Sequence, residues 1–243
     1  MNKSSSEPKA IGSPPGAFRI ALEFLSLIRA RKVLDCPAGE GPFSRMLLEH
    51  GFEVTSCDIY PEQFKLTEIS CDFADLNDGL PYESNKFDAV ACLNGLQRIW
   101  ARGRAVQELA RVVMPGGYLI VSFPNNSDIR RRLLFMMTGS VTWNVIGPPH
   151  VCLPEAENPA ACFRYPMSLS NVLSAVNSVG LKCESIRSTH YSKGAIFLSP
   201  LIIGPKIYSL LSPKKYQNFY MMKHTSTLDA LLGAWLVVIA RKP

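Results

Sequence analysis

The alternation of short apolar runs with helix-like segments constrains the fold of this chain more than any other feature of its sequence. In the first half, mostly apolar runs such as 32–35 and 53–57 are each followed by a segment whose apolar residues recur with helical spacing. Such alternation is typical of βαβ units, which build a mostly parallel sheet with helices on both faces. The sequence therefore predicts an α/β, Rossmann-like fold.

The pattern also gives bounds for the expected elements. Ser168 is expected to cap a helix and Gly180 to end it. Strands are expected at 32–35, 53–57, 68–71, 87–92, 118–123, 181–189 and 235–241, and helices at 17–30, 43–50, just after Pro61, 101–113, 129–137 and 168–179.

Composition along the chain predicts its domain organisation. Residues 1–16 are polar and rich in Pro, Gly and Ser, which predicts a disordered tail. We expect residues 17–243 to form a single domain with cap insertions at about 128–166 and 199–224. The sequence has neither a secretory signal nor an apolar stretch of roughly 20 residues, so we expect a cytoplasmic protein.

The charge balance and the cysteines exclude several classes of function. The chain carries 26 Lys and Arg against 20 Asp and Glu, a formal net charge of +6 that suits an anionic substrate or an anionic membrane surface. Nucleic acid is not expected as a partner, because no stripe of basic and aromatic residues is present. We interpret the basic run 128–134 as the solvated face of a helix. Seven cysteines without C-x-x-C spacing argue against a disulfide framework and against a zinc site, so no metal is predicted.

The stretch VLDCPAGEG, residues 33–41, joins the first predicted strand to the helix that follows it. Gly39 and Gly41 lack a Cβ, so the backbone there can approach a ligand closely. Ligands of open parallel sheets bind at the carboxyl ends of the strands. Asp35 ends the first strand and Asp58 the second, where a carboxylate can accept hydrogen bonds from both hydroxyls of a ribose. These residues predict a nucleotide site.

Two kinds of nucleotide compete for this loop. A dinucleotide fold requires G-x-G-x-x-G with the helix N-terminus aimed at a pyrophosphate, and residues 39–44, GEGPFS, are a variant of that pattern. However, Glu40 lies within the turn that would receive the phosphate, and Asp35 adds a second carboxylate. These charges repel a pyrophosphate and attract a cation. A nucleoside that carries positive charge is therefore favoured over NAD.

Four segments in order resemble the motifs of class I S-adenosylmethionine-dependent methyltransferases. VLDCPAGEG is similar to the first motif, and SCDIYPEQF to the second-strand motif whose acid holds the ribose. FADLNDGLPYESNKFDAV resembles the segment that recognises adenine, and ELARVVMPGGYLIVSFPN the helix, Pro-Gly-Gly turn and fifth strand. The resemblance covers roughly 30–125 and resumes at the last strands. Within the superfamily it is greatest to the methionine-biosynthesis protein W-like and ubiquinone/menaquinone methyltransferase-like groups.

The resemblance implies a cofactor, a fold and a set of binding residues. The cofactor is S-adenosylmethionine, with S-adenosylhomocysteine as the product, and the sheet has seven strands with the last one antiparallel and a helical or loop cap. In this sequence, the implied cofactor-binding residues are Asp35, Ala38, Gly39 and Gly41 around the methionyl and ribose parts, Asp58 at the ribose, Ile59, Asp75 and Leu76 at the adenine, and Leu93, Asn94 and Gln97 under the sulfonium.

The sequence departs from the family pattern at two places. Pro37 replaces the usual first glycine, which is tolerable only if no amide is needed there. The loop 94–98 lacks the histidine that is often present, so the acceptor chemistry stays open. Asp75 has a second interpretation, as the cap of a turn in DLNDG, with Asp72 in its place at the adenine.

The expected acceptor is a small, apolar or anionic molecule, and the second half of the chain offers the side chains to bind it. His150 is the first choice for a catalytic base, ahead of Tyr165, His190 and Tyr191, and two arginines, Arg98 and Arg164, are candidate anion anchors. We expect residues 124–126 to face loop 93–98 across an open channel that Arg98 and Trp100 are best able to close. The alternative is a non-catalytic, S-adenosylmethionine-binding accessory protein that regulates a partner enzyme.

The segment 199–224 is apolar and aromatic with scattered lysines, and three interpretations of it stay open. As part of the cap, together with 143–166, it would close over the acceptor. As an interfacial element it would make peripheral contact with an anionic membrane through Lys206, Lys214 and Lys215. The third interpretation, a helical pair packed on the sheet, is favoured over membrane contact. The sequence does not indicate an oligomeric state.

Overall fold

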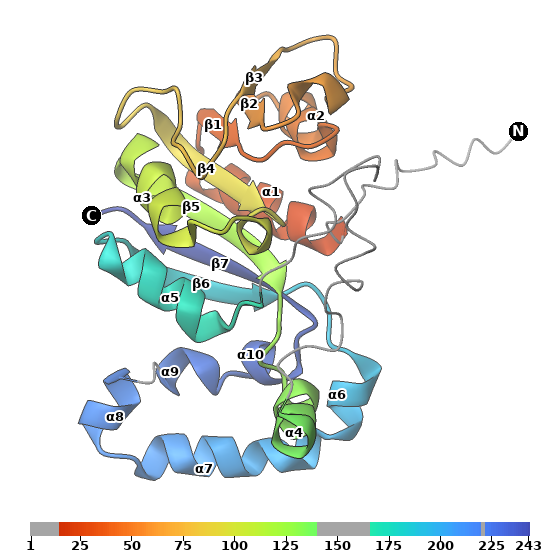
Figure 1. The fold of residues 1–243 in the computed structure, drawn as a ribbon, viewed down its shortest axis with the longest axis vertical. Coiled ribbons are helices and arrows are strands. Elements are labelled where there is room, and N and C mark those ends of the chain that lie inside the picture. The colour runs from red at the N-terminus through yellow and green to blue at the C-terminus, as the bar shows by residue number, and fades with distance from the viewer. Residues whose placement is uncertain (1–14, 140–165, 220–221) are drawn as a thin grey trace, which may run out of the picture.

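The computed structural model describes residues 15–139, 166–219 and 222–243, and these form a layered α/β structure around one sheet. The sheet has seven strands in the order β3-β2-β1-β4-β5-β7-β6 (Figure 1). Strands β1 to β5 pair in parallel, whereas β7 is antiparallel to both β5 and β6. This confirms the predicted fold. The strands are β1 Lys32–Asp35, β2 Glu53–Asp58, β3 Cys71–Phe73, β4 Phe87–Leu93, β5 Val113–Pro124, β6 Lys182–Ser188 and β7 Trp235–Arg241.

Helices cover both faces of the sheet and a further group lies at one end of the molecule (Figure 1). Ser168 caps α5 by accepting a hydrogen bond from the N–H of Asn171, as the sequence predicts. The helices are α1 Pro15–Ile28, α2 Pro42–Glu49, α3 Arg102–Val112, α4 Ile129–Thr138, α5 Leu169–Ser178, α6 Lys193–Phe197, α7 Ile203–Leu211, α8 Lys214–Phe219, α9 Met222–Thr225 and α10 Leu228–Leu232, with short 3-10 turns η1 Pro61–Gln63, η2 Leu96–Arg98 and η5 Ser199–Ile202.

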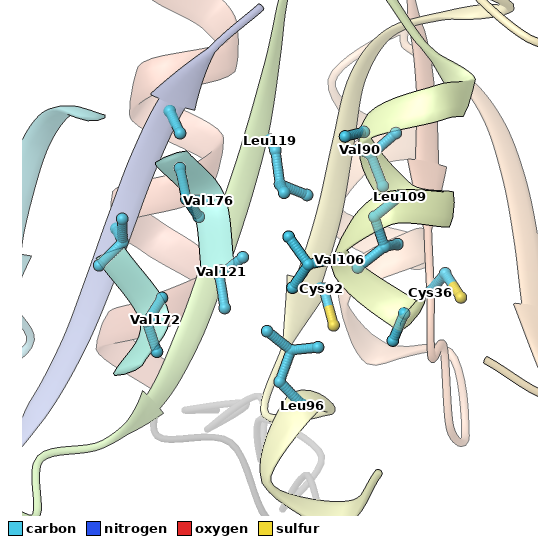
Figure 2. Close-up of a cluster of buried hydrophobic side chains, with 14 of the residues drawn as sticks. Cys36, Val90, Cys92, Leu96, Val106, Leu109, Leu119, Val121, Val172 and Val176 are labelled. Atoms are coloured by element: carbon cyan, nitrogen blue, oxygen red, sulfur yellow. The ribbon is translucent and has the colours of Figure 1, made fainter. Parts of the chain in front are cut away.

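Alternating side chains of the central strands supply two cores, one on each face. On one face, Leu119 and Val121 of β5 pack with Val106 of α3 and Val176 of α5 (Figure 2). On the other face, the intervening residue Ile120 joins the core of α1 and α2. Because neighbouring residues of a strand point to opposite faces, a strand buried on both sides is apolar throughout. This is why the central strands are readily recognised in the sequence.

Two strands differ from their predicted bounds by more than one residue at an end. β3 comes later than 68–71, because the chain pairs with the end of β2 only from Cys71, which lies opposite Ser56. β5 begins at Val113 instead of residue 118. The Gly116–Gly117 pair is a kink within it, since Gly116 has φ 80° and a Cβ on Gly117 would lie 2.6 Å from the Asp88 carbonyl. Helix α1 also starts two residues before the predicted 17, at Pro15.

The basic run 128–134 is not a solvated face, so that interpretation is wrong. Asp128 is buried and caps α4, and it forms an ion pair of 2.6 Å with Arg131, whose side chain is only 11% exposed. Arg132 donates from Nε to the Ser127 carbonyl and from Nη2 to the Thr225 carbonyl. The arginines therefore anchor α4 to its own loop and to α9.

The segment 199–224 does not form a helical pair packed on the sheet. None of the residues of α7 is buried, and α7 contacts η5 at the end of the molecule where α4 and α6 also lie (Figure 1). Within the described ranges, no helix is both long and apolar enough to cross a bilayer.

Five of the seven cysteines lie in the described part of the chain. Cys36, Cys57, Cys71, Cys92 and Cys183 are free thiols, and the first two and Cys92 are buried. Cys152 and Cys162 lie outside the described residues. In the part of the chain that the structure describes, no group of three or more His, Cys, Asp or Glu side chains is arranged to hold a metal ion.

A charged pair on α3 holds the loop that precedes β4. Arg111 donates to the carbonyls of Leu80 and Tyr82 and to Glu108, and Glu108 also accepts from the N–H of Leu80. The Arg104 guanidinium adds a bond to the Asp78 carbonyl. These hydrogen bonds thus fix the segment that carries the predicted adenine-binding residues to α3.

Replacement of Arg111 by Met should lower the free energy of unfolding by about 1–3 kcal/mol, because loop carbonyls and Glu108 lose a charged donor. Arg19→Met is the matched control. It breaks only an exposed pair with Glu23 and should change stability by less than about 0.5 kcal/mol. Urea denaturation followed by circular dichroism measures both, and equal effects of the two variants would contradict the proposed anchoring.

Candidate functional site

A cavity of about 280 Å³ lies at the carboxyl ends of β1, β2 and β4. This is the edge of a parallel sheet at which ligands bind in open α/β folds. Nine of the eleven predicted binding residues line it. They are Asp35, Ala38, Gly39, Asp58, Ile59, Asp75, Leu76, Leu93 and Asn94.

The carboxylate of Asp58 fixes the glycine loop. Its Oδ2 accepts from the N–H of Gly39 at 2.8 Å, and its Oδ1 accepts from the N–H of Tyr60 at 3.0 Å. Gly39 has φ 56°, and a Cβ built there would meet no atom within 4 Å. The loop thus turns at the cavity with open space beside its backbone, while Asp58 keeps lone pairs for a ligand.

Asp35 lies deeper, at the end of β1, and is only 1% exposed. Ser44 donates to its Oδ2 at 2.6 Å, and the Ser44 hydroxyl is also 2.8 Å from that of Ser56. Burial raises the pKa of Asp35, the Ser44 hydrogen bond opposes this shift and the nearby Asp58 charge adds to it, so that the pKa is about 7. This carboxyl therefore changes its charge near neutral pH.

Glu40 contributes less negative charge than the sequence suggests. Its carboxylate pairs with Lys65 Nζ at 2.7 Å, and its carbonyl accepts from the Lys65 N–H. The argument against a pyrophosphate consequently depends on Asp35 and Asp58, which have no such ion pair among the described residues. Lys65 lies outside all four motifs, so the sequence did not point to this pairing.

The Asp75 segment forms the predicted turn cap and also borders the cavity. Asp75 Oδ1 accepts from the N–H and from the side-chain amide of Asn77, which is the turn cap expected for DLNDG. Asp75 and Leu76 nevertheless line the cavity. Asp72 accepts from the Tyr82 hydroxyl and is absent from the lining, so it does not take the place of Asp75 there.

The loop after β4 is held against the glycine loop by close packing. Asn94 has φ 61°, and Gln97 donates from Nε2 to both the carbonyl and the side-chain oxygen of Asn94. A Cβ on Gly95 would lie 2.3 Å from Cδ of Pro37 and 2.9 Å from Sγ of Cys92. The unusual Pro37 is therefore accommodated because position 95 has no side chain.

Gly41 and Gln97 do not line the cavity. Gly41 is the N-cap of α2 and has φ 89°. A Cβ built on it would lie 2.7 Å from the Phe64 ring, so no open space remains beside it. Gln97 is buried, and its Nε2 holds Asn94. Both residues shape the loops that line the cavity.

The thiols near the glycine loop are not nucleophiles. A hydrogen bond with the Cys57 thiol, together with burial, raises the pKa of Cys36 well above its ordinary value. Burial raises the pKa of Cys92 to about 12. A thiol that stays protonated near neutral pH is a poor nucleophile, so these residues act as small buried side chains.

The candidate acceptor residues that the structure describes do not meet at the cavity, apart from Arg98. His150, Arg164 and Tyr165 lie outside the described residues. His190 is exposed beside Thr189, and the Tyr191 hydroxyl donates to Asp229, both away from the lining.

Residues 124–126 are expected to face loop 93–98 across an open channel, but in the described part of the chain none of them lines the cavity. Asn125 is fully buried, and its side-chain amide donates to the carbonyls of Ala230 and Gly233. Its Oδ1 accepts from the Ser127 N–H, so Asn125 secures the end of β5 to α10. Asparagine after a strand is equally compatible with a ligand and with such a brace, which is why the sequence did not distinguish them.

Several lining residues were missed by the sequence analysis. Phe18 of α1 stacks on Phe43 of α2 at 5.4 Å between ring centroids, and both rings border the cavity. Their spacing in the sequence predicts only that they are buried on a helix face. The folded structure is needed to show that they border the cavity. Cys36, Tyr60, Gln63, Asn77 and Ile99 belong to the same group.

A model of the methyltransferase domain family matches residues 34–121. A demethylmenaquinone methyltransferase of Paenarthrobacter aurescens is 31% identical over 108 residues, which cover 43% of each chain, so this chain spans less than half of that relative. A ubiquinone biosynthesis O-methyltransferase of Xylella fastidiosa is 27% identical over 186 residues, covering 71% of this chain and 70% of the relative.

The fold has matches among solved structures. A methyltransferase from Archaeoglobus fulgidus, described as dependent on S-adenosylmethionine, superposes with a TM-score of 0.55 over 93% of this chain and 94% of that chain. The sequence identity is 13%, so this likeness shows the fold alone.

Replacement of Gly95 by Ala should lower the free energy of unfolding by about 1–3 kcal/mol, because the added methyl overlaps Pro37 and Cys92. Gly103→Ala is the control. Gly103 lies in α3 with nothing near its Cβ position, so alanine there should raise stability by up to about 1 kcal/mol. Thermal and urea unfolding compare the two, and a neutral Gly95→Ala would show that the loops are not in close contact.

Asp35 should make the stability of the protein depend on pH. Its folded-state pKa of about 7 lies above the ordinary aspartate value of 3.8. The stabilisation from its bound proton is complete below about pH 4 and is lost as the pH rises through 7. Asp35→Asn, which keeps an acceptor for Ser44, should remove this fall from urea midpoints measured between pH 4 and 8. The exposed Glu62→Gln should keep it, and identical profiles for all three proteins would contradict the assignment.

Proposed function

We propose that this chain, which belongs by domain and fold to the class I S-adenosylmethionine-dependent methyltransferase superfamily, transfers a methyl group from S-adenosylmethionine to a small apolar or anionic molecule. The observation that carries the proposal is the convergence of the glycine loop, Asp58 and Asp35 on one cavity. Residues of three of the four sequence motifs border the same space.

The chain's own residues suggest how the cofactor is held. Asp58 is placed to accept hydrogen bonds from the ribose, with Ile59 beside it for the adenine. Asp75 and Leu76 border the adenine end. The open side of Gly39 leaves room for the methionyl part to approach the backbone.

Charge at the cavity favours this ligand over a dinucleotide. Asp35 and Asp58 are both buried, where Coulomb interactions are several times stronger than in water. A sulfonium and an ammonium group are attracted by them, whereas a pyrophosphate is repelled. Lys65 is an exposed residue that already pairs with Glu40.

When bound, the cofactor supplies an electrophilic methyl group: the acceptor atom bonds to the methyl carbon as the carbon–sulfur bond breaks, and sulfur keeps the electron pair. The side chains then orient the acceptor and exclude water. Leu93 and Asn94 border the cavity beside the loops that would surround the sulfonium. The acceptor's proton leaves to solvent or to a base, for which His150 remains our proposal.

The relatives indicate the acceptor class. Their names refer to demethylmenaquinone and to ubiquinone biosynthesis, and we extend this to a hydroxylated or quinol-type aromatic ring as acceptor. The stacked rings of Phe18 and Phe43 and the side chain of Ile99 offer apolar walls for such a ring. Arg98, also in the lining, suits an anionic substituent.

The accessory-protein alternative gains no support from Trp100, one of the two residues expected to close the channel. Trp100 is 71% exposed and does not line the cavity. Labelled S-adenosylmethionine should give labelled product when hydroxylated quinone precursors are added. Tight cofactor binding without turnover on any ring acceptor, together with a co-purifying enzyme, would support the accessory role instead.

Calorimetry provides the direct test of the cofactor site. S-adenosylmethionine and S-adenosylhomocysteine should bind, and NAD should not. Asp58→Ala should weaken S-adenosylmethionine binding by about 1–3 kcal/mol, since the ribose hydroxyls lose a charged acceptor. Glu62→Ala removes an exposed carboxylate from η1, outside the cavity lining, and should leave the affinity unchanged. NAD binding in place of S-adenosylmethionine would overturn the proposal.

A further inference from the structure

The helices at the end of the molecule expose an unusual amount of apolar surface. We call α4, α6, η5, α7 and α8 the end face. Most of the exposed large apolar side chains of the described residues lie on it, namely Phe135, Met136, Met137, Ile196, Phe197, Leu201, Ile203, Ile207, Tyr208, Leu210, Leu211 and Tyr216. Contiguous apolar patches on a protein surface mark sites of interaction.

Helix α7 shows that this exposure is organised. Ile203, Ile207, Leu210 and Leu211 recur at helical spacing and are all exposed, so they form one outward stripe. Its less exposed residues, Pro205 and Ser209, instead line a cavity between α4, α7 and α9. The helix therefore turns its apolar side outward, as expected for an element that contacts an apolar phase.

The charged side chains of α4, α6, η5, α7 and α8 are all basic. Between Glu184 and Asp229 the sequence contains no Asp or Glu, but it contains Lys193, Lys206, Lys214, Lys215 and Lys223. The adjoining cavity of about 550 Å³ is lined by Arg131 and Arg132, and its described lining includes no carboxylate. Phe135 and Tyr208 belong both to this lining and to the exposed apolar set, so the cavity adjoins the end face.

We propose that the end face docks on an anionic phospholipid bilayer, with its apolar side chains in the interface and its lysines among the headgroups. Lysines flanking outward apolar residues fit this partner, because anionic headgroups neutralise them while the acyl region receives the side chains. A second copy of this chain fits less well, because facing lysine sets would repel each other. The proposal is independent of the methyl-transfer reaction.

Co-sedimentation of the full chain with lipid vesicles tests the docking. Binding should be strong to phosphatidylcholine vesicles that contain phosphatidylglycerol, weak to phosphatidylcholine alone, and reduced by added salt. Lys214→Glu with Lys215→Glu should weaken binding about tenfold or more. Lys182→Glu with Arg187→Glu changes the net charge equally on exposed positions of β6 and should have a much smaller effect.

The apolar contribution has its own matched pair. Leu210→Ser and Leu27→Ser each replace the penultimate residue of a helix, at positions 80% and 78% exposed. Only the first lies on the end face, so only it should weaken vesicle binding, by several-fold. Both variants should keep the calorimetric affinity for S-adenosylmethionine. A failure of the vesicle experiment can therefore be distinguished from a failure of the cofactor experiment.

Three results would overturn the proposal. The first is equal binding to neutral and anionic vesicles or to neither. The second is an equal loss in the control variants. The third is a stable dimer by light scattering that Leu210→Ser dissociates, because the end face would then contact a second copy.

Discussion

The Asp58 carboxylate accepts hydrogen bonds from the N–H groups of Gly39 and Tyr60, and the shape of the cofactor cavity depends on these two bonds. Strand pairing brings the ends of β1 and β2 together, with Asp35 opposite Ser56, but it does not determine how the loop beyond Asp35 turns. The bond to Gly39 determines that turn, because it links the loop to the end of the neighbouring strand. A ligand that uses the remaining lone pairs of Asp58 therefore binds a group already oriented by the backbone, and loses little freedom in doing so.

The proposed cofactor cavity and the end face lie in different parts of the molecule. Motif residues on β1, β2 and β4 build the cavity, whereas the arginine-lined cavity and the exposed apolar stripe lie among α4, α7 and their neighbours. The two linings share no residue. Asn125 connects the parts, since it follows β5 and binds the carbonyls of Ala230 and Gly233 before α4 begins. Such a brace fixes the start of the helical end relative to the sheet edge that carries the proposed cofactor-binding residues.

The sequence predicted the sheet because its strands are buried on both faces and its loops carry distinctive residues. β1 and β7 have the predicted bounds, and nine of eleven candidate binding residues meet at one cavity. The features that the sequence did not predict depend on contacts that form only in the folded chain. Three such contacts have no distinctive pattern in the local sequence. They are the ion pair between Lys65 and Glu40, the packing of Gly95 on Pro37, and the burial of Arg131 against Asp128. A charged or small residue has the same propensity whether it is solvated or paired, so only the tertiary structure distinguishes these cases.

The electrostatics of the cavity link cofactor binding to protonation. With Glu40 paired to Lys65, the cavity's attraction for a cation comes mainly from Asp58 and Asp35, and burial raises the pKa of Asp35 to about 7. A cation near Asp35 stabilises its ionised form, so binding releases a proton at pH values below that pKa. By reciprocity, deprotonation of Asp35 strengthens cation binding by the same free energy. A pyrophosphate would shift this equilibrium in the opposite direction. The burial that makes Asp35 costly to ionise would thus also favour the proposed positively charged nucleoside, since the same low dielectric strengthens the attraction.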